Sequence, residues 1–346
     1  MDIRLENVLE YEQPTKYIVK SENYSDDFAL PVLTAGKSFV LGFTDETDGI
    51  CKASESPVII FDDFTADCKY VDFDFKVKSS AMKILHKANT EDNLKYYFYA
   101  MQAIDYTPFS HKRVWISEYS KFKIKSRSVA EQNNIVKELD TVATAIDNTK
   151  QRLNALDELV KSRFIEMFGD IRISSIFPNI ALENFAQIGS SKRVHAADYV
   201  ESGVPFYRSK EIIELGNGQE PSVELFISKK QYESIKKTNG VPCKGDILMS
   251  AVGTIGKMWI VDGRKDFYYK DGNIISIHSD ETNPIYLKEA LANLIDDFKS
   301  ANVAGSAYSA LTIVKLKKMT VPMPPMSIQN EFADFVKLID KSKFVG

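Results

Sequence analysis

The sequence repeats itself once, and this repeat is the feature that most restricts the fold. Arg4–Val8 reads RLENV, and Ala181–Phe185 reads ALENF at an offset of 177 residues. Four more segments match in the same order in both halves: Leu30–Leu33 with Val204–Tyr207, Val58–Phe61 with Asp246–Met249, Ile116, Tyr119 and Phe122 with Ile313, Leu316 and Met319, and Gln132, Ile135 and Leu139 with Gln329, Phe332 and Val336. The last matches stand at an offset of 197, so the second half carries about 20 extra residues. We therefore expect two domains of one fold.

Each half contains both strand and helix patterns. Tyr70–Val77 alternates polar and apolar residues with period two, which predicts a strand. A helix is predicted across residues 91–104, with a counterpart across residues 284–298. Glycine-containing turns such as Asp262-Gly263 separate the short strands. The pattern predicts two similar mixed α/β domains.

A long helix is predicted between the halves, across residues 128–168. It begins with the capping-box sequence Ser128–Glu131, and no proline or glycine follows until Gly169. Apolar residues then recur in steps of four and three, interrupted once by Thr149: Ile135, Leu139, Val142, Ile146, Leu153, Leu156 and Val160. This is a heptad seam, which predicts a coiled-coil partner. A helix of this length spans roughly 60 Å, which suits a spacer between two domains.

The repeat also predicts a partner for this helix. After Pro322–Pro325, a second helix begins near Ser327 and carries Phe332, Val336 and Ile339 on one face. Its roughly 17 residues cover less than half of the long seam when packed antiparallel. The predicted class is α+β, with two similar domains separated by coiled-coil helices in a pseudo-twofold arrangement. The expected boundaries are 1–127 for the first domain, 128–170 for the spacer helix, 171–325 for the second domain and 326–346 for the final helix.

Composition narrows the cellular context more than the function. The net charge is −4, and residues 173–325 carry 18 basic and 17 acidic side chains, so bulk charge does not mark a nucleic-acid binder. No apolar run is long enough to span a bilayer, and the N-terminus lacks a signal-peptide core. The three cysteines are widely spaced and suit a reducing cytoplasm. We expect a cytoplasmic protein with no membrane partner.

Sequence motifs for catalysis are missing. The chain has no nucleotide-binding glycine loop and no HExxH. Met323–Met326 lacks the polar head and aromatic tail of the [N/D]PP[Y/F] motif of DNA amino-methyltransferases. The four histidines show no metal-ligand spacing, and Asp62, Asp63 and Asp67 are expected to be solvated turn acids. We expect no catalytic residue, no metal and no cofactor on this chain.

The ordered motifs resemble the specificity (S) subunits of type I restriction–modification enzymes. The second half carries the closer match, in five segments: Leu182-Glu183-Asn184, Gly203–Ile212, Lys244–Ser250, Gly253–Gly256 and Gly305-Ser306, followed by the Pro322–Pro325 run before Gln329. The first half matches more weakly, because it lacks Gly-Asp-Ile-Leu and a proline run before Gln132. Together the matches cover nearly the whole chain.

This resemblance implies a role without chemistry of its own. In the family, two target-recognition domains each read one half of a split site in double-stranded DNA. The helices bind two modification (methyltransferase) subunits, which hold S-adenosylmethionine, and restriction subunits add translocation and cleavage. A rigid spacer lets two domains meet a duplex about one helical turn apart, roughly 34 Å.

Candidate DNA contacts follow from polar and basic residues beside predicted turns. An arginine can read guanine through a bidentate contact, and glycine-flanked turns let backbone approach phosphate. The candidates in the second domain are Ser190, Ser191, Lys192, Arg193, Tyr207, Arg208, Lys210, Thr254, Lys257, Ser306 and Tyr308. Those in the first domain are Thr34, Lys37, Lys112 and Arg113, while the neighbouring Trp115 is expected to be buried.

Three alternatives remain open at this stage. The chain could be a truncated or variant subunit whose short final helix is completed by a second copy or another chain. It could be an adaptor that recruits proteins through an exposed coiled-coil seam, with domains that do not bind DNA. It could also be a DNA-modifying enzyme without familiar motifs. Salt-sensitive duplex binding separates DNA recognition from the adaptor, because phosphate contacts release counterions.

Overall fold

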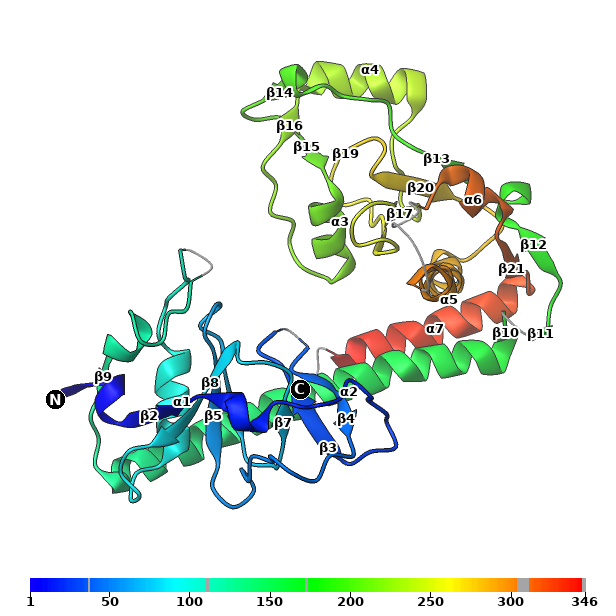
Figure 1. Cartoon of the computed structure of the whole chain (residues 1–346). Coiled ribbons are helices and arrows are strands. Elements are labelled where there is room, and N and C mark those ends of the chain that lie inside the picture. Colours follow the sequence, from blue (N-terminus) through cyan, green and yellow to red (C-terminus); the bar gives the residue numbers. More distant parts are fainter. Residues whose placement is uncertain (37, 110–111, 172–173, 304–310, 344–346) are drawn as a thin grey trace. The chain divides into compact units, whose positions relative to one another are not determined.

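The computed structural model describes residues 1–36, 38–109, 112–171, 174–303 and 311–343. The chain divides into two compact units, Met1–Thr149 and Lys150–Gly346. The expected helix between the halves is α2 (Val129–Phe168), whose first part belongs to the first unit and whose second part belongs to the second (Figure 1). Ser128 caps it, since its hydroxyl accepts the Glu131 N–H at 3.4 Å and the Glu131 carboxylate accepts the Ser128 N–H at 2.9 Å in return. The predicted α+β class with a long central helix is confirmed.

The first unit contains an antiparallel four-stranded sheet and a smaller three-stranded sheet. The large sheet has the order β2-β8-β5-β6, and in the small one β3 pairs antiparallel with β4 and parallel with β7. The elements are β1 (Asp2–Arg4), η1 (Leu5–Asn7), β2 (Leu9–Glu12), η2 (Pro14–Tyr17), β3 (Leu30–Leu33), β4 (Val40–Thr44), β5 (Val58–Asp62), β6 (Cys68–Val71), β7 (Lys76–Val77), β8 (Met82–Lys87), α1 (Leu94–Gln102), η3 (Tyr119–Lys121) and β9 (Lys123–Lys125).

The second unit has two four-stranded sheets and a larger set of helices. One sheet is antiparallel with the order β13-β20-β17-β18, and in the other β15 runs parallel to β19. The strands and short turns are β10 (Gly169–Asp170), β11 (Ser174–Ser175), β12 (Asn179–Ala181), η4 (Leu182–Asn184), β13 (Gln187–Gly189), η5 (Ala196–Asp198), β14 (Tyr199–Val200), β15 (Val204–Tyr207), β16 (Phe226–Ile227), β17 (Ile247–Ser250), β18 (Met258–Ile260), β19 (Tyr268–Tyr269), β20 (Ile274–His278) and β21 (Thr320–Pro322). The helices are α3 (Ser209–Gly216), α4 (Lys229–Asn239), α5 (Pro284–Val303), α6 (Ile313–Lys318) and α7 (Met326–Lys343).

The predicted repeat is seen in equivalent strand pairs and backbone hydrogen bonds of the two units. β1 pairs with β9 in the register Ile3↔Ile124, and β12 pairs with β21 in the register Ile180↔Val321. These pairs differ by the offsets of 177 and 197 seen in the sequence. The first backbone amide after each strand also finds an equivalent carbonyl: Leu5 donates to Phe122 at 3.1 Å, and Leu182 donates to Met319 at 2.9 Å.

A buried glutamine anchors the start of a long helix in each unit. In the second unit, Oε1 of Gln329 accepts the backbone N–H of Asn283 at 2.8 Å, and its Nε2 donates to the carbonyl of Pro324 at 2.9 Å. Asn283 caps α5 and donates to Asn330 at 2.8 Å. The first unit repeats this arrangement with the same distances from Asn93 to Gln132 and Asn133. We call these residues the amide clamps.

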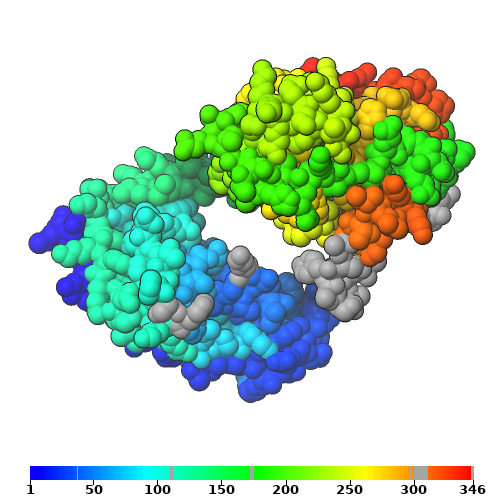
Figure 2. All heavy atoms as spheres, turned by 90° about the horizontal axis from the view of Figure 1, so that it is seen from above, coloured from blue at the N-terminus to red at the C-terminus, as the bar shows by residue number. Residues whose placement is uncertain are grey.

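The extra residues of the second unit lie mostly between β15 and β17. There the second unit has α3, β16 and α4, where the described residues of the first unit form β4 and a loop. Residues 210–240, yellow-green in the space-filling view, form a continuous part of this unit's surface (Figure 2). The increase in offset from 177 to 197 is therefore largely a helical insertion.

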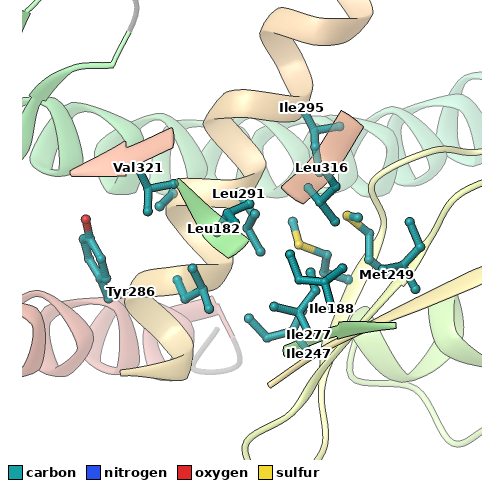
Figure 3. Close-up of a cluster of buried hydrophobic side chains, with 14 of the residues drawn as sticks. Leu182, Ile188, Ile247, Met249, Ile277, Tyr286, Leu291, Ile295, Leu316 and Val321 are labelled. Atoms are coloured by element: carbon teal, nitrogen blue, oxygen red, sulfur yellow. The ribbon is translucent and has the colours of Figure 1, made fainter. Parts of the chain in front are cut away.

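The main core of the second unit lies between the antiparallel sheet and α5. Ile188, Ile247 and Ile277 of the sheet point toward Leu291 and Ile295 of the helix, as Figure 3 shows. A second set of side chains, all aromatic, joins α5 to the two long helices: Phe164, Phe168, Tyr286 and Phe332. Their ring centroids lie 4.8 Å apart for Phe168 and Tyr286, and 5.5 Å apart for Phe164 and Phe332. This packing holds α7 alongside the second part of α2 (Figure 1).

One predicted strand is wrong. Tyr70–Val77 divides into β6 and β7, which belong to different sheets. Asp74 causes the break, because its carboxylate accepts hydrogen bonds from Lys52 Nζ at 2.7 Å and from the Ser54 hydroxyl at 2.6 Å. The two predicted helices are α1, which is shorter than residues 91–104, and α5, which extends beyond residue 298.

The amide clamp gives a stability prediction. Gln329→Ala leaves the partly buried Asn283 N–H and the buried Pro324 carbonyl without their glutamine partner, so we expect the second unit to lose about 2 kcal/mol of unfolding free energy. The matched control is Glu331→Ala, which removes a side chain 64% exposed from the same helix and is expected to cost less than about 0.5 kcal/mol. Urea unfolding of both variants measures the difference. Equal stability of the two variants would contradict the role of the clamp.

Candidate nucleic-acid interface

In the second unit, the polar loops suggested by the sequence lie together where the strands of the antiparallel sheet begin or end, on one side of the sheet. β13 and β17 end there, and β18 and β20 begin there, because neighbouring strands run in opposite directions. Ser190 joins two of the loops, since its hydroxyl donates to the carbonyl of Ile274 at 3.3 Å and accepts the N–H of Gly272 at 3.2 Å. Ala251 N–H donates to the carbonyl of Asn273 at 2.8 Å. We call residues 190–193, 251–257 and 270–273 the loop edge of the second unit.

Ser190, Ser191 and Lys192 line one surface hollow at this edge. Further along, the hollow is bordered by residues 239–243, Asp246 and His278. Lys192 is exposed, and its backbone N–H donates to the hydroxyl of Tyr268 at 2.6 Å, which fixes the loop. Arg193 is exposed and pairs with Asp271 at 2.7 Å. The structure therefore places Ser190, Lys192 and Arg193 together on one accessible surface, whereas the hydroxyl oxygen of Ser191 is buried.

Tyr207 and Arg208 are less available than the sequence suggested. Tyr207 is only 3% exposed and stacks on Phe267 at 4.7 Å between centroids, which corrects the expectation that it contacts DNA. Arg208 forms ion pairs with Glu211 at 2.7 Å and Glu224 at 2.9 Å. Glu211 is 1% exposed, so these hydrogen bonds raise the pKa of Arg208 and hold its guanidinium in the protein. The exposed Lys210 shares Glu224 at 3.2 Å.

Thr254 and Lys257 are exposed on the turn between β17 and β18. The buried hydroxyl of Ser250 holds this turn by accepting the Lys257 N–H at 3.0 Å. Gly256 has φ +79°, and a Cβ there would lie 2.4 Å from Cγ2 of Ile295, so packing against α5 requires this glycine. Lys257 itself lines a different groove, together with residues of α2, α5 and α7. Ser306, Tyr308 and Lys37 lie outside the described residues.

In the first unit, the equivalent edge is built around Asp63. Its Oδ1 accepts the N–H groups of Val114 at 3.1 Å and Trp115 at 2.9 Å, which positions Lys112 and Arg113 on the surface. Asp63 and its ion-pair partner Lys83, at 3.4 Å, are 1% and 2% exposed. Asp62 is also buried and accepts the Phe64 N–H at 2.8 Å. The expectation that Asp62 and Asp63 are solvated turn acids is therefore wrong, because both organise the turn from inside.

The other first-unit candidates have local roles. Thr34 is partly exposed at the end of β3, and its hydroxyl donates to the carbonyl of Ser38 at 2.7 Å. Arg113 is exposed and lies over the ring of Phe64 at 6.0 Å. Trp115 is 1% exposed in the core, as expected.

The heptad seam on α2 has two parts. Val160 is buried with Phe332 and Val336, and Ile339 packs against the same cluster. Lys343 pairs with Asp157 at 2.8 Å and Arg163 with Glu331 at 3.4 Å, so α7 runs antiparallel to this part of α2. The other seam residues are more exposed to solvent. Ile135, Leu153 and Leu156 are partly exposed, and Leu139, Val142 and Ile146 are 37%, 55% and 51% exposed.

No group of three histidine, cysteine, aspartate or glutamate side chains in the described part of the chain could hold a metal ion. None of the helices described is long and apolar enough to cross a membrane.

Comparison with known proteins relates the second unit to a family of DNA specificity domains. Residues 177–344 match the family described as the type I restriction modification DNA specificity domain. The second unit therefore carries a type I DNA specificity domain. The chain is 47% identical over 162 residues to a type I restriction enzyme specificity subunit of Escherichia coli, covering 43% of this chain and 40% of that one. The E. coli match thus spans less than half of the relative's length.

Two further likenesses extend over more of the chain. A candidate type I restriction enzyme specificity subunit of Haemophilus influenzae is 25% identical over 298 residues, covering 82% of this chain and 74% of the relative. The crystal structure of a type I system S subunit from M. genitalium superposes with a TM-score of 0.57 at 15% identity, covering 99% of this chain and 90% of that one. The latter supports the fold of this chain.

His278 beside the hollow gives a pH prediction. The hydrogen bond of 2.7 Å that Nδ1 of His278 donates to Oδ1 of Asp246 raises the pKa of His278 above its ordinary value of 6.5. Because the folded pKa is the higher one, the stabilisation is complete below pH 6.5 and disappears as pH rises through the folded value. The excess melting temperature of the wild type over His278→Gln should therefore fall as the pH rises above about 6.5. A pH-independent difference between the two would contradict this account.

Proposed function

We propose that this chain is the DNA-sequence recognition subunit of a type I restriction–modification complex and that its two units read the two halves of a split site. The observation that carries the proposal is the match of residues 177–344 to a DNA specificity domain, in a chain whose first unit repeats the register of that domain. A repeated scaffold with different loops suits two half-sites of different sequence, since base contacts specify and backbone contacts position.

The loop edge is the surface we assign to the duplex. In the second unit it presents the exposed residues Ser190, Lys192 and Arg193, and the equivalent end of the first unit's sheet presents Lys112 and Arg113. Arg193 is 71% exposed, so solvent screens its pair with Asp271, which contributes only about 1 kcal/mol and can be exchanged for a base or phosphate contact. Arg208 would first have to leave the buried Glu211, which makes it a weaker candidate.

We further propose that catalysis belongs to partner subunits. Two modification subunits would bring S-adenosylmethionine and methyl transfer, and restriction subunits would bring cleavage. The exposed apolar residues Leu139, Val142 and Ile146 of α2 support a docking role for this helix, because apolar side chains at heptad spacing favour a helical partner. A cytoplasmic location accompanies this proposal, because bacterial DNA lies there.

A binding selection tests the proposal. The full chain, with and without its modification subunit, is incubated with a random-sequence duplex pool, and the bound DNA is sequenced. We expect two short specific blocks around a fixed gap. A single block would mean that only one unit reads sequence.

An adaptor function is the competing outcome, favoured by the exposed residues of α2. It predicts a stable complex with the modification subunit and no enrichment of any sequence from the pool. That result would overturn the proposal that this chain supplies specificity.

A further inference from the structure

Two lysines occupy the same position in the two units. Lys78 follows β7 and Lys270 follows β19, the short strands that run parallel to β3 and β15. The backbone N–H of Lys78 donates to the carbonyl of Leu33 at 2.9 Å, and that of Lys270 donates to the carbonyl of Tyr207 at 2.9 Å. The two lysines are therefore at equivalent positions in the repeat, because their backbone N–H groups make the same hydrogen bond.

The surroundings of these lysines differ between the units. Two residues earlier, the first unit has the buried Lys76, paired with Glu46 at 2.8 Å, where the second has Tyr268. The buried Asp63–Lys83 pair of the first unit corresponds to Ala251 and Ile275 in the second. Since the core chemistry has changed around them, packing alone gives no reason for a lysine at both places.

Both ammonium groups are accessible to an anion. Lys270 is exposed, and no described residue forms an ion pair or side-chain hydrogen bond with it. Lys78 pairs with Glu22, whose side chain is 79% exposed, and lies 5.9 Å from the ring of Tyr24. A surface pair of this kind contributes only about 0–1 kcal/mol, so a phosphate can replace Glu22.

Each lysine stands at the edge that carries the candidate DNA contacts. The residues after Lys270 are Asp271, which holds Arg193, and Gly272, which donates to Ser190. In the first unit, the loop after Lys78 reaches Ala81, whose carbonyl accepts the N–H of Asp63 at 3.3 Å. Asp63 in turn positions the segment with Lys112 and Arg113.

We propose that Lys78 and Lys270 are equivalent contacts of the two units to the DNA phosphate backbone. This inference rests on the proposed function and adds to it the residues that set the position of each unit on the duplex. A phosphate contact carries no sequence information, so domains that read different half-sites can share it. A contact to a base would be expected to differ between them.

Salt titration of duplex binding tests the pair. We expect Lys78→Gln and Lys270→Gln each to make the plot of log Kobs against log salt concentration less steep by about 0.9 and the double variant by about 1.8, with the selected sequence unchanged. Lys78→Arg and Lys270→Arg keep the charge and should keep the slope. Glu22→Gln frees Lys78 and should strengthen binding, which a merely structural role of Lys78 does not predict.

The matched controls are Lys137→Gln on α2 and Lys341→Gln on α7, two exposed lysines on helices rather than at the loop edges. They remove the same charge and should leave the slope within error. A wild-type chain that shows no salt-dependent duplex binding would overturn the proposed function itself. A wild type with a steep slope that both Lys→Gln variants retain would overturn this inference alone.

Discussion

The buried glutamine that begins each long helix is the interaction on which the arrangement of each unit depends. Gln132 and Gln329 each accept the amide of an asparagine that caps the neighbouring domain helix. They bury their own amides in doing so, which is favourable only when every hydrogen bond is made. Nearby, the hydroxyl of Tyr96 donates to the carbonyl of Lys125, and the hydroxyl of Tyr286 donates to the carbonyl of Pro322, its equivalent in the second unit. The domain and its helix are thereby fixed as one body within each unit, so the loop edge is held in a defined place on its own helix.

The sequence predicted best the residues that fix backbone hydrogen bonds in both units. The LEN triplets and the glutamines recur because both units need the same hydrogen bonds at those places. The strand at Tyr70–Val77 was misread, because alternation does not show that the Asp74 carboxylate will turn the chain. The role of Asp63 was missed since its partners, Lys83 and Trp115, are 20 and 52 residues away.

The candidate site was harder to predict than the fold. Lys192 and Arg193 reach the surface as expected, but a polar residue beside a turn carries no sign of its partner. Arg208 is held by Glu224, which lies 16 residues further along in the inserted region. The sequence does not predict Lys78 and Lys270 as DNA contacts, because a single lysine forms no motif. Only the matching hydrogen bonds to Leu33 and Tyr207 show that the two lysines are equivalent. A divided design follows: the scaffold and its phosphate contacts are repeated, while the loops that meet bases are free to differ.

The most direct test of two reading units is a hydroxyl-radical footprint of the full chain, bound with its modification subunit to a duplex of the selected sequence. The account predicts two protected tracts on the DNA, separated by a gap that remains open to cleavage. One continuous tract, or a single tract that covers only one block of the sequence, would contradict it.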